Sequence, residues 1–158
     1  MVRKYKKISA SILVIGNEIL SGRTKDQNVS YLASWLNTNL GIKIQEVRIV
    51  QDEEREIIKN LLNLSKNYNY VFTTGGIGPT HDDITAKSIS RAFKKKYIYN
   101  NEAYNILSKY YGKKEFNDSR KKMAKMPEGS KLIYNPSSAA PGFMIKNIIC
   151  LPGVPLIL

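Results

Sequence analysis

Short apolar runs alternate with amphipathic segments along the first two-thirds of this 158-residue chain. The strand-like runs are residues 8–15, 42–50 and 70–74, and the helix-like segments are residues 28–40, 53–62 and 84–93. Buried parallel strands are near-continuous apolar runs, whereas helices repeat their apolar residues every three or four positions. Strands that alternate with helices predict βαβ units. We therefore expect an α/β fold of three layers, α/β/α, with a mostly parallel central sheet.

Capping signals mark the ends of the expected helices. Asn28 is a candidate N-cap for the first helix, and Gly41 supplies its C-terminal stop. Asp52 is a candidate N-cap for the second helix, and Asp82 or Asp83 for the third. These polar and glycine residues separate the helices from the strands.

The pattern changes in the last third of the chain. The segments expected there are helices over 101–111 and 118–126 and strands over 131–134, 143–146 and 148–151. In the earlier strand 42–50, the alternation slips between Ile44 and Val47, which predicts a bulge or an edge position. No linker or repeat divides the sequence, so residues 1–158 are expected to form a single domain.

Bulk composition narrows the classes of function. No apolar run approaches the ~20 residues that cross a bilayer, and Cys150 is the only cysteine, so a cytoplasmic protein without disulfides or a cysteine zinc site is expected. The net charge of +12 is compatible with nucleic-acid binding. However, the lysine runs lie in polar segments without aromatic stacking motifs. A solvated surface is the favoured interpretation, and nucleic acid is an improbable partner.

A glycine-rich, acid-tipped loop follows the strand 70–74. Residues 73–83 read Thr-Thr-Gly-Gly-Ile-Gly-Pro-Thr-His-Asp-Asp. Glycines allow positive φ and a close approach of the backbone to a ligand, and the next helix offers N–H groups to an anion. The spacing matches neither a P-loop nor a dinucleotide fingerprint. The loop is interpreted as an oxyanion or phosphate cradle, and the alternative is a tight turn with a double cap.

Four polar segments each follow an expected strand: residues 16–22, 51–52, 75–83 and 152–153. The carboxyl ends of parallel strands share one edge of a sheet, where ligands bind. Spacing alone therefore gathers these segments into one pocket. Their acids are Glu18, Asp52, Asp82 and Asp83, which together suit a Mg²⁺ ion that bridges ligand phosphates. Taken singly, each is interpreted as a cap or a solvated charge.

Five motifs occur in an order that resembles the molybdopterin-binding domain family. They are residues 16–22, 26–28, 74–85, 135–143 and 151–155. The resemblance covers nearly the whole chain. It is strongest to the amino-terminal domain of CinA proteins, to stand-alone bacterial molybdopterin-binding proteins, and to the molybdopterin-binding-like domain of FAD synthases. It implies a domain that binds molybdopterin or a related adenylated molecule and that is often trimeric.

The resemblance leaves the chemistry open between branches. In the adenylyltransferase branch, acids that match Asp52 and Asp83 serve Mg²⁺-dependent transfer of AMP. In the CinA and FAD-synthase branch, the pocket is associated with metal-dependent cleavage of pyrophosphates such as ADP-ribose or FAD. The adenylyltransferase branch usually has a more basic loop tip where this chain has Pro79-Thr80-His81-Asp82, which argues against that branch. In the CinA-like branch an acid is common at the position of Asn17, so a metal contact is not expected there. The sequence also stops in mid-pattern, which predicts a longer native protein.

These arguments define an expected set of site residues. The catalytic candidates are Asp52, Asp82 and Asp83, and Asp52 and Asp83 are the candidate ligands of Mg²⁺ or another divalent cation. The ligand-binding candidates are Gly16, Asn17, Glu18, Ser21, Gly22, Asp26, Asn28, Thr74, Gly75, Gly76, Gly78, Pro79, Thr80, His81, Ser138, Pro141, Gly142, Pro152 and Gly153. Two functions remain: a pocket for a pterin or nucleotide pyrophosphate with metal-dependent cleavage, or a non-catalytic molybdopterin carrier. A homo-oligomer such as a trimer is the expected assembly.

Overall fold

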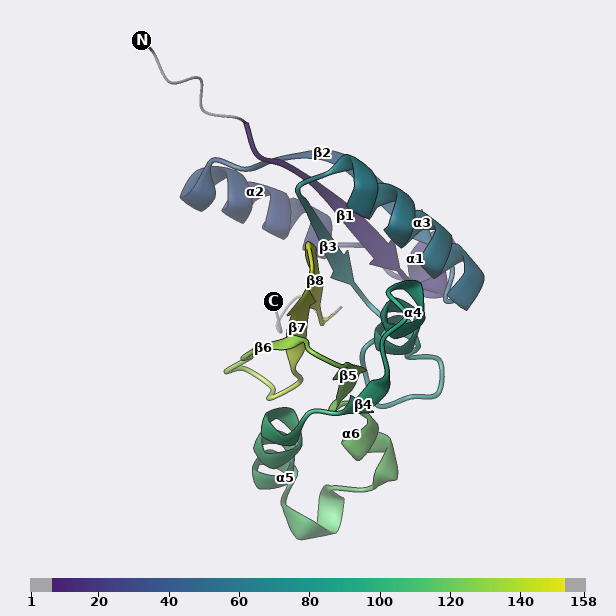
Figure 1. Ribbon diagram of the computed structural model, residues 1–158, viewed down its shortest axis with the longest axis vertical. Helices are drawn as coiled ribbons and strands as arrows, with labels where there is room; N and C mark the ends of the chain where they lie inside the picture. The colour runs from purple at the N-terminus through teal and green to yellow at the C-terminus, as the bar shows by residue number, and fades with distance from the viewer. Residues whose placement is uncertain (1–6, 153–158) are drawn as a thin grey trace.

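A six-stranded mixed sheet forms the centre of the computed structural model, which describes residues 7–152 (Figure 1). Its strand order is β2-β1-β3-β8-β7-β6. The strands are β1 (Ser9–Ile15), β2 (Lys43–Val50), β3 (Tyr70–Thr74), β6 (Lys131–Ile133), β7 (Gly142–Ile145) and β8 (Ile148–Leu151). The first four in this order run parallel, and β7 and β6 are antiparallel to their neighbours. The expected mostly parallel α/β sheet is therefore confirmed.

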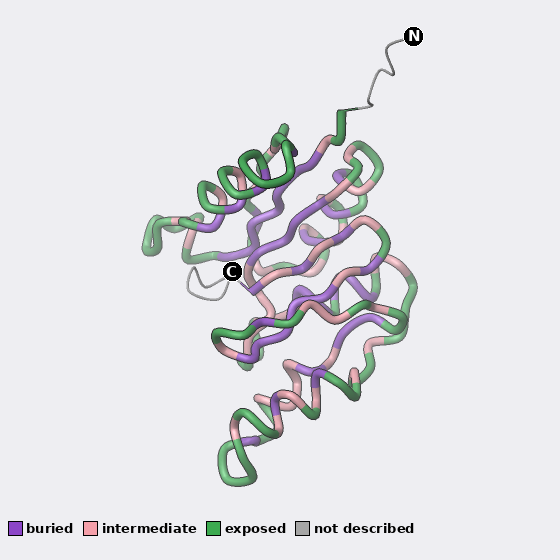
Figure 2. The backbone as a smooth tube through the Cα atoms, turned by 90° about the vertical axis from the view of Figure 1, so that its left-hand side faces the viewer, coloured by how far each residue is buried: buried purple, intermediate pink, exposed green. Residues whose placement is uncertain are grey.

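Helices cover both faces of this sheet (Figure 1). They are α1 (Asn17–Leu20), α2 (Asn28–Leu40), α3 (Glu54–Asn67), α4 (Thr85–Ala92), α5 (Asn101–Glu115) and α6 (Asp118–Lys122). Leu32 and Leu36 of α2 pack with Ile12 on one face, while Ile57 of α3 and Ile89 of α4 belong to the core on the other face. The buried backbone of the strands runs between these layers (Figure 2).

Strand β2 is the edge of the sheet, and its pairing with β1 carries the irregularity that the sequence predicts. Ala10 lies opposite Ile44, but the next residue, Ser11, lies opposite Glu46. One residue of β2 is therefore bulged out, and every later side chain changes face. The slip in alternation is explained by both the bulge and the edge position.

Three expected helix caps are replaced by other contacts. Helix α2 ends at Gly41 with φ +65°, as expected, but its N-terminal amide at Val29 donates to Asp26 and not to Asn28. No side-chain cap hydrogen bond forms at the start of α3 or α4. Asp52 accepts the Asn17 amide at the start of α1 instead, and Asp83 accepts hydrogen bonds from Thr80 in the glycine loop. The predictions that Asn28 caps α2, Asp52 caps α3 and Asp82 or Asp83 caps α4 are wrong: Asp26 binds the first turn of α2, and Asp52 and Asp83 bind amides of other segments.

The segment 118–126 does not form the single helix that its pattern favours. Helix α6 stops at Lys122, and Lys125–Pro127 forms strand β5, which pairs antiparallel with β4 (Tyr97–Tyr99). Met126 lies opposite Ile98 in this small second sheet and is 2% exposed. Pairing with a segment nearly 30 residues away overrides a local helical preference. Helices α5 and α6 with β4 and β5 form what we call the α5–α6 unit, which lies beside the main sheet (Figure 1).

The last strands form a hairpin that is anchored to α3. Strands β7 and β8 are joined by Lys146 and Asn147, close to the strand limits expected from the sequence. The Asn147 amide donates to the carbonyl oxygens of Ser65 and Tyr68 at 3.0 Å each, and its Oδ1 accepts from Ser65 Oγ at 2.7 Å. This side chain satisfies carbonyls at the end of α3. It therefore sets where β8 lies beside β3.

Within residues 7–152, no helix is both long and apolar enough to cross a membrane. Cys150 is fully buried in β8, as expected, and burial raises the pKa of its thiol to about 12.

Candidate functional site

A cavity of about 360 Å³ opens at the carboxyl ends of β1 and β3. Eleven of the residues expected at the site line it: Glu18, Asp26, Asn28, Thr74, Gly75, Gly76, Gly78, Pro79, Asp83, Ser138 and Pro152. They come from the first loop, the glycine loop, the loop before β7 and the end of β8. The chain thus brings together segments more than 130 residues apart, at the sheet edge where ligands bind in open α/β folds.

Backbone geometry explains why the glycine loop needs its glycines. Gly75 and Gly76 have φ values of +93° and +67°. A Cβ atom on Gly75 would lie 2.0 Å from the Ile15 carbonyl oxygen, and one on Gly76 would lie 2.2 Å from Thr85 Oγ1. Only glycine combines positive φ with so close an approach to a neighbouring strand and helix. The loop is therefore a rigid turn packed directly on β1 and α4.

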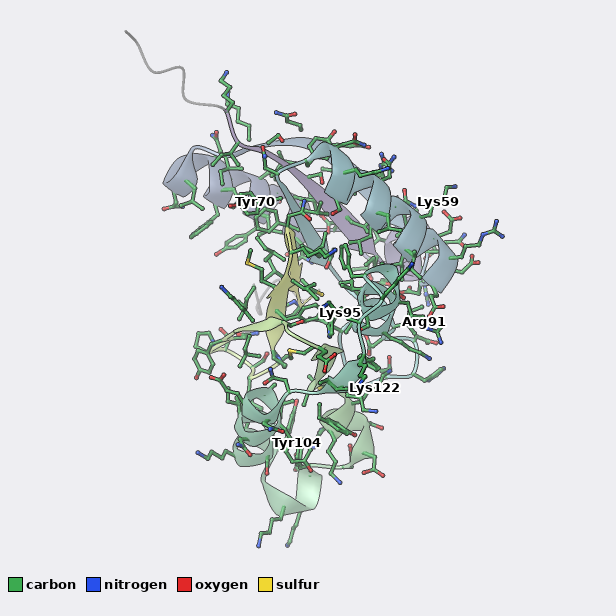
Figure 3. All side chains as sticks on the ribbon, in the orientation of Figure 1. Lys59, Tyr70, Arg91, Lys95, Tyr104 and Lys122 are labelled. Carbon is green, nitrogen blue, oxygen red and sulfur yellow. The ribbon has the colours of Figure 1, made fainter. Side chains whose placement is uncertain are left out.

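Hydrogen bonds fasten both ends of this loop. Thr85 donates its amide to the Gly76 carbonyl and its hydroxyl to the Gly75 carbonyl, both at 2.9 Å. At the tip, Asp83 Oδ2 accepts from the amide and the hydroxyl of Thr80 at 2.7 Å each. Lys122 Nζ of α6 donates to the Thr80 carbonyl at 2.7 Å. The α5–α6 unit is thus tied to the tip of the loop, near the labelled Lys122 in Figure 3.

Asp52 contacts the first loop from the end of β2. Its Oδ2 accepts the amide of Asn17 at 2.7 Å. Burial raises the pKa of the Asp52 carboxyl above its usual value, and the Asn17 hydrogen bond opposes that shift. The nearby carboxylates of Glu18, Asp82 and Asp83 raise it further. These four acids therefore share one electrostatic environment, although Asp52 and Asp82 do not line the cavity.

Two buried oxygens at the cavity lack a partner within the described part of the chain. Asp26 uses Oδ2 to accept the Val29 amide at 2.9 Å, while its Oδ1 is buried without a hydrogen bond. Thr74 Oγ1, at the end of β3, is also buried without a hydrogen bond. Buried polar atoms are usually satisfied, and the exceptions call for an explanation. Because both residues line the cavity, a ligand or an ordered water bound at this place would satisfy these two oxygens.

The other expected residues adjoin the cavity or face solvent. Gly16 is buried at the end of β1, where a Cβ atom would lie 2.6 Å from the Glu18 carboxylate. Pro141 is buried beside the glycine loop, Gly142 is buried at the start of β7, and Ser21 and Gly22 are exposed. The His81 side chain is 94% exposed and lies 3.2 Å from Asp82, itself 75% exposed. Gly153 lies outside the described residues.

Sequence reasoning missed the apolar part of the lining: Val14, Ile15, Ile19, Ile77, Tyr111, Met123 and Ala140. Val14 and Ile15 directly precede a segment that was expected at the site, and Ile19, Ile77 and Ala140 lie within such segments, so their position in the sequence was a usable signal. Tyr111 and Met123 belong to the α5–α6 unit, and no local pattern indicates that this unit reaches the cavity. The docking of the unit puts them there.

The charged side chains of the lining are all acidic. Among the described residues they are Glu18, Asp26 and Asp83, with no lysine or arginine. No three Asp, Glu, His or Cys side chains within residues 7–152 converge to hold a metal ion by themselves. Mg²⁺ is commonly bound by one or two carboxylates together with water and ligand phosphates. The carboxylates therefore fit a cation that is shared with a ligand, and not a closed protein cage.

Comparisons with known proteins agree with this geometry. Residues 11–158 match a family model described as "Probable molybdopterin binding domain". A protein of Archaeoglobus fulgidus is 39% identical over 91% of this chain and 61% of its own length. A CinA-like protein of Fusobacterium nucleatum is 37% identical over 94% of this chain and 37% of its own length. The chain thus spans about 60% or less of these relatives.

Solved structures are similar over nearly the whole chain. The protein CinA of Thermoplasma acidophilum, described there as of unknown function, superposes with a TM-score of 0.88 at 32% identity. The match covers 96% of this chain and 92% of that one. MoaB of Thermus thermophilus matches with a TM-score of 0.59 at 15% identity, over 94% and 82% of the two chains, which shows a shared fold. From the family model and these relatives, the chain belongs to the molybdopterin-binding domain family, in its CinA-like branch.

Proposed function

We propose that this cavity binds a pterin- or nucleotide-type pyrophosphate compound, of which molybdopterin, ADP-ribose and FAD are the candidates, together with a divalent cation. One observation carries the proposal: a rigid glycine turn and a set of carboxylates line one cavity that has no basic side chain in the described chain. Backbone amides in such turns favour phosphate oxygens. The carboxylates repel the same phosphates unless a cation lies between them.

Different lining residues would contact different parts of the ligand. Gly75, Gly76 and Gly78 offer backbone to phosphate oxygens, and Asp26 and Thr74 offer unpaired oxygens to hydroxyl or amino groups of the ligand. Glu18 and Asp83, supported by Asp52, are the acids for the cation. A bound Mg²⁺ would neutralise charge that develops on a phosphoryl oxygen.

For catalysis, the reaction is hydrolysis of the pyrophosphate. A water oxygen bonds to one phosphorus atom, the bridging P–O bond breaks, and the bridging oxygen leaves with the other phosphate. ADP-ribose and water would thus give AMP and ribose 5-phosphate. Asp52 adjoins the cavity and is the proposed acceptor of the proton that the attacking water loses, because burial and the neighbouring acids raise its pKa and make its carboxylate a stronger base.

A non-catalytic carrier is the second candidate, and one observation favours it. Asp83 Oδ2 is already engaged by two hydrogen bonds from Thr80, which makes the carboxylate a support of the loop. In a carrier the same pocket holds molybdopterin without activating water. The two functions differ in turnover and not in binding.

The test is binding and turnover by the purified protein. ADP-ribose, FAD and molybdopterin are each titrated with Mg²⁺ and with Mn²⁺ by calorimetry, and products are separated by chromatography. Release of AMP that is lost in Asp83→Asn but retained in the exposed, distant control Glu128→Gln supports the enzyme. Binding without turnover supports the carrier. The proposal fails if none of the three compounds binds with either metal.

A further inference from the structure

The α5–α6 unit contributes an aromatic side chain to the cavity. Tyr111 of α5 lines it, and so does Met123, which follows α6. The same unit contacts the tip of the glycine loop through Lys122 and the Thr80 carbonyl. One wall of the cavity therefore comes from a part of the chain that has no share in the main sheet (Figure 1).

The chain holds the Tyr111 ring in place without a ligand. Gly112 adopts φ +70° and ψ 169° and breaks the helix directly after Tyr111. The Arg120 guanidinium lies over the ring, 4.3 Å from its centroid, and Tyr110 contacts it edge-on at 5.0 Å. Arg120 is fixed in turn, because its Nη1 donates to the Glu115 carbonyl at 2.8 Å and lies 2.9 Å from a Glu115 carboxylate oxygen. The ring is thus preorganised, which reduces the entropy lost when a ligand packs on it.

The glycine loop and the carboxylates for the cation do not recognise a planar ring. The glycine loop and the carboxylates interact with phosphates and a cation, which many metabolites share. A planar heterocycle gains from stacking on an aromatic ring, and a thioether adds a polarisable contact. Tyr111 and Met123 are the lining residues that offer these two surfaces.

We propose that Tyr111, supported by Met123, stacks on the planar heterocycle of the ligand and makes the site selective for ring-bearing pyrophosphates over ring-free ones. The inference rests on the proposed function, since it assumes that a pyrophosphate lies at the glycine loop. Tyr111 is the specificity-determining contact, and Arg120 is a positioning residue that holds the ring.

Two classes of probe separate the heterocycle from the phosphates. ADP-ribose and FAD carry planar rings, whereas inorganic pyrophosphate does not. All three are titrated with Mg²⁺ by calorimetry against the parent, Tyr111→Leu, Tyr111→Phe and Tyr31→Leu. Tyr31 is the matched control, because it is 51% exposed on α2 and does not line the cavity. Thermal unfolding of each variant checks that it is folded.

Tyr111→Leu is expected to weaken ADP-ribose and FAD by about 10- to 100-fold, the range that loss of a stacked base predicts. Pyrophosphate affinity should change by less than about threefold, since it makes no such contact. Tyr111→Phe keeps the ring and should bind like the parent.

Three results overturn the inference. Equal losses for pyrophosphate and ADP-ribose mean that Tyr111 only maintains the shape of the cavity. Unchanged affinity for ADP-ribose and FAD in Tyr111→Leu means that the heterocycle lies elsewhere, and the proposed function then survives without this contact. If the parent binds none of the three probes, the proposed function fails together with the inference.

Discussion

At the scale of single residues, the cavity depends on positions where a side chain has no space. Gly76 has φ +67°, and a Cβ atom added to it would lie 2.2 Å from Thr85 Oγ1. Gly129, in the turn after β5, has φ +82° with no atom within 4 Å. The two glycines share the conformational demand but differ in crowding. Alanine substitutions at the two positions therefore distinguish the cost of backbone strain from the cost of steric overlap.

Gly76→Ala is expected to lower the free energy of unfolding by about 2–4 kcal/mol, from positive-φ strain plus overpacking. Gly129→Ala, the control, carries only the strain of about 1–2 kcal/mol. Urea denaturation of both variants measures the difference. Equal losses would show that the Thr85 contact yields without cost and that the loop is not as rigid as its packing indicates.

The half-buried acid Asp52 predicts a pH dependence of stability. Because its pKa is raised in the folded state, the fold binds a proton more tightly than the unfolded chain does. Its contribution to stability is therefore greatest below the unfolded value of 3.8 and declines as pH rises through the raised folded value. Asp52→Asn removes this decline.

Asp52→Asn should accordingly be more stable relative to the parent at pH 7 than at pH 4, with the free energy of unfolding measured in urea at both values. Glu128→Gln, exposed in the turn after β5, is the matched control. A difference between variant and parent that is the same at both pH values would contradict the assignment of Asp52 as a destabilised carboxylate.

At the scale of elements, side chains in turns decide how neighbouring elements dock. Asn147 links the β7–β8 hairpin to the end of α3 through three hydrogen bonds. Its own carbonyl accepts the Val71 amide at the start of β3. The position of β8, and hence of Pro152 at the cavity, follows from this junction.

Asn147→Ala should cost about 1–3 kcal/mol, because the carbonyls of Ser65 and Tyr68 lose their donor in a partly buried place. Ser65→Ala removes only the hydroxyl contact, and we expect a loss of about 1 kcal/mol or less. Hydrogen exchange locates the effect, since the Val71 amide should exchange faster in Asn147→Ala. Unchanged protection of Val71 would show that the strand pairing alone holds the junction.

At the scale of the whole molecule, the charges are segregated. The chain carries a net charge of +12, yet the charged residues of the cavity lining are acids. An anionic ligand is thus attracted by the protein as a whole but repelled at close range. The divalent cation of the proposed function would resolve this conflict.

ADP-ribose should therefore bind at least about tenfold more weakly with EDTA than with Mg²⁺, because uncompensated repulsion of that size costs about 1.4 kcal/mol. Calorimetry at constant ionic strength, with KCl replacing MgCl₂, separates cation binding from general screening. Equal affinity in EDTA would show that the carboxylates do not hold a cation in the complex.

The sequence by itself determined the parallel α/β core and most of the polar lining of the cavity. Ser9–Ile15 forms β1 because a short run that is mostly apolar and β-branched is most stable at the centre of a sheet covered on both faces. The glycine loop was predictable because its neighbours along the chain carry the whole signal. The acids and glycines that follow strands meet at one edge by topology alone.

Only the tertiary structure decided the rest, because it depends on contacts between segments that are distant in sequence. Strand β5 exists because β4 pairs with it, against the helical pattern of residues 118–126. Asp52 accepts the first amide of α1 and Asp83 accepts from Thr80, not from the helices that follow them in the sequence, because packing brought those donors nearer. Tyr111 reaches the cavity through the docking of the α5–α6 unit. Local periodicity records which face of an element is buried, but not which partner buries it.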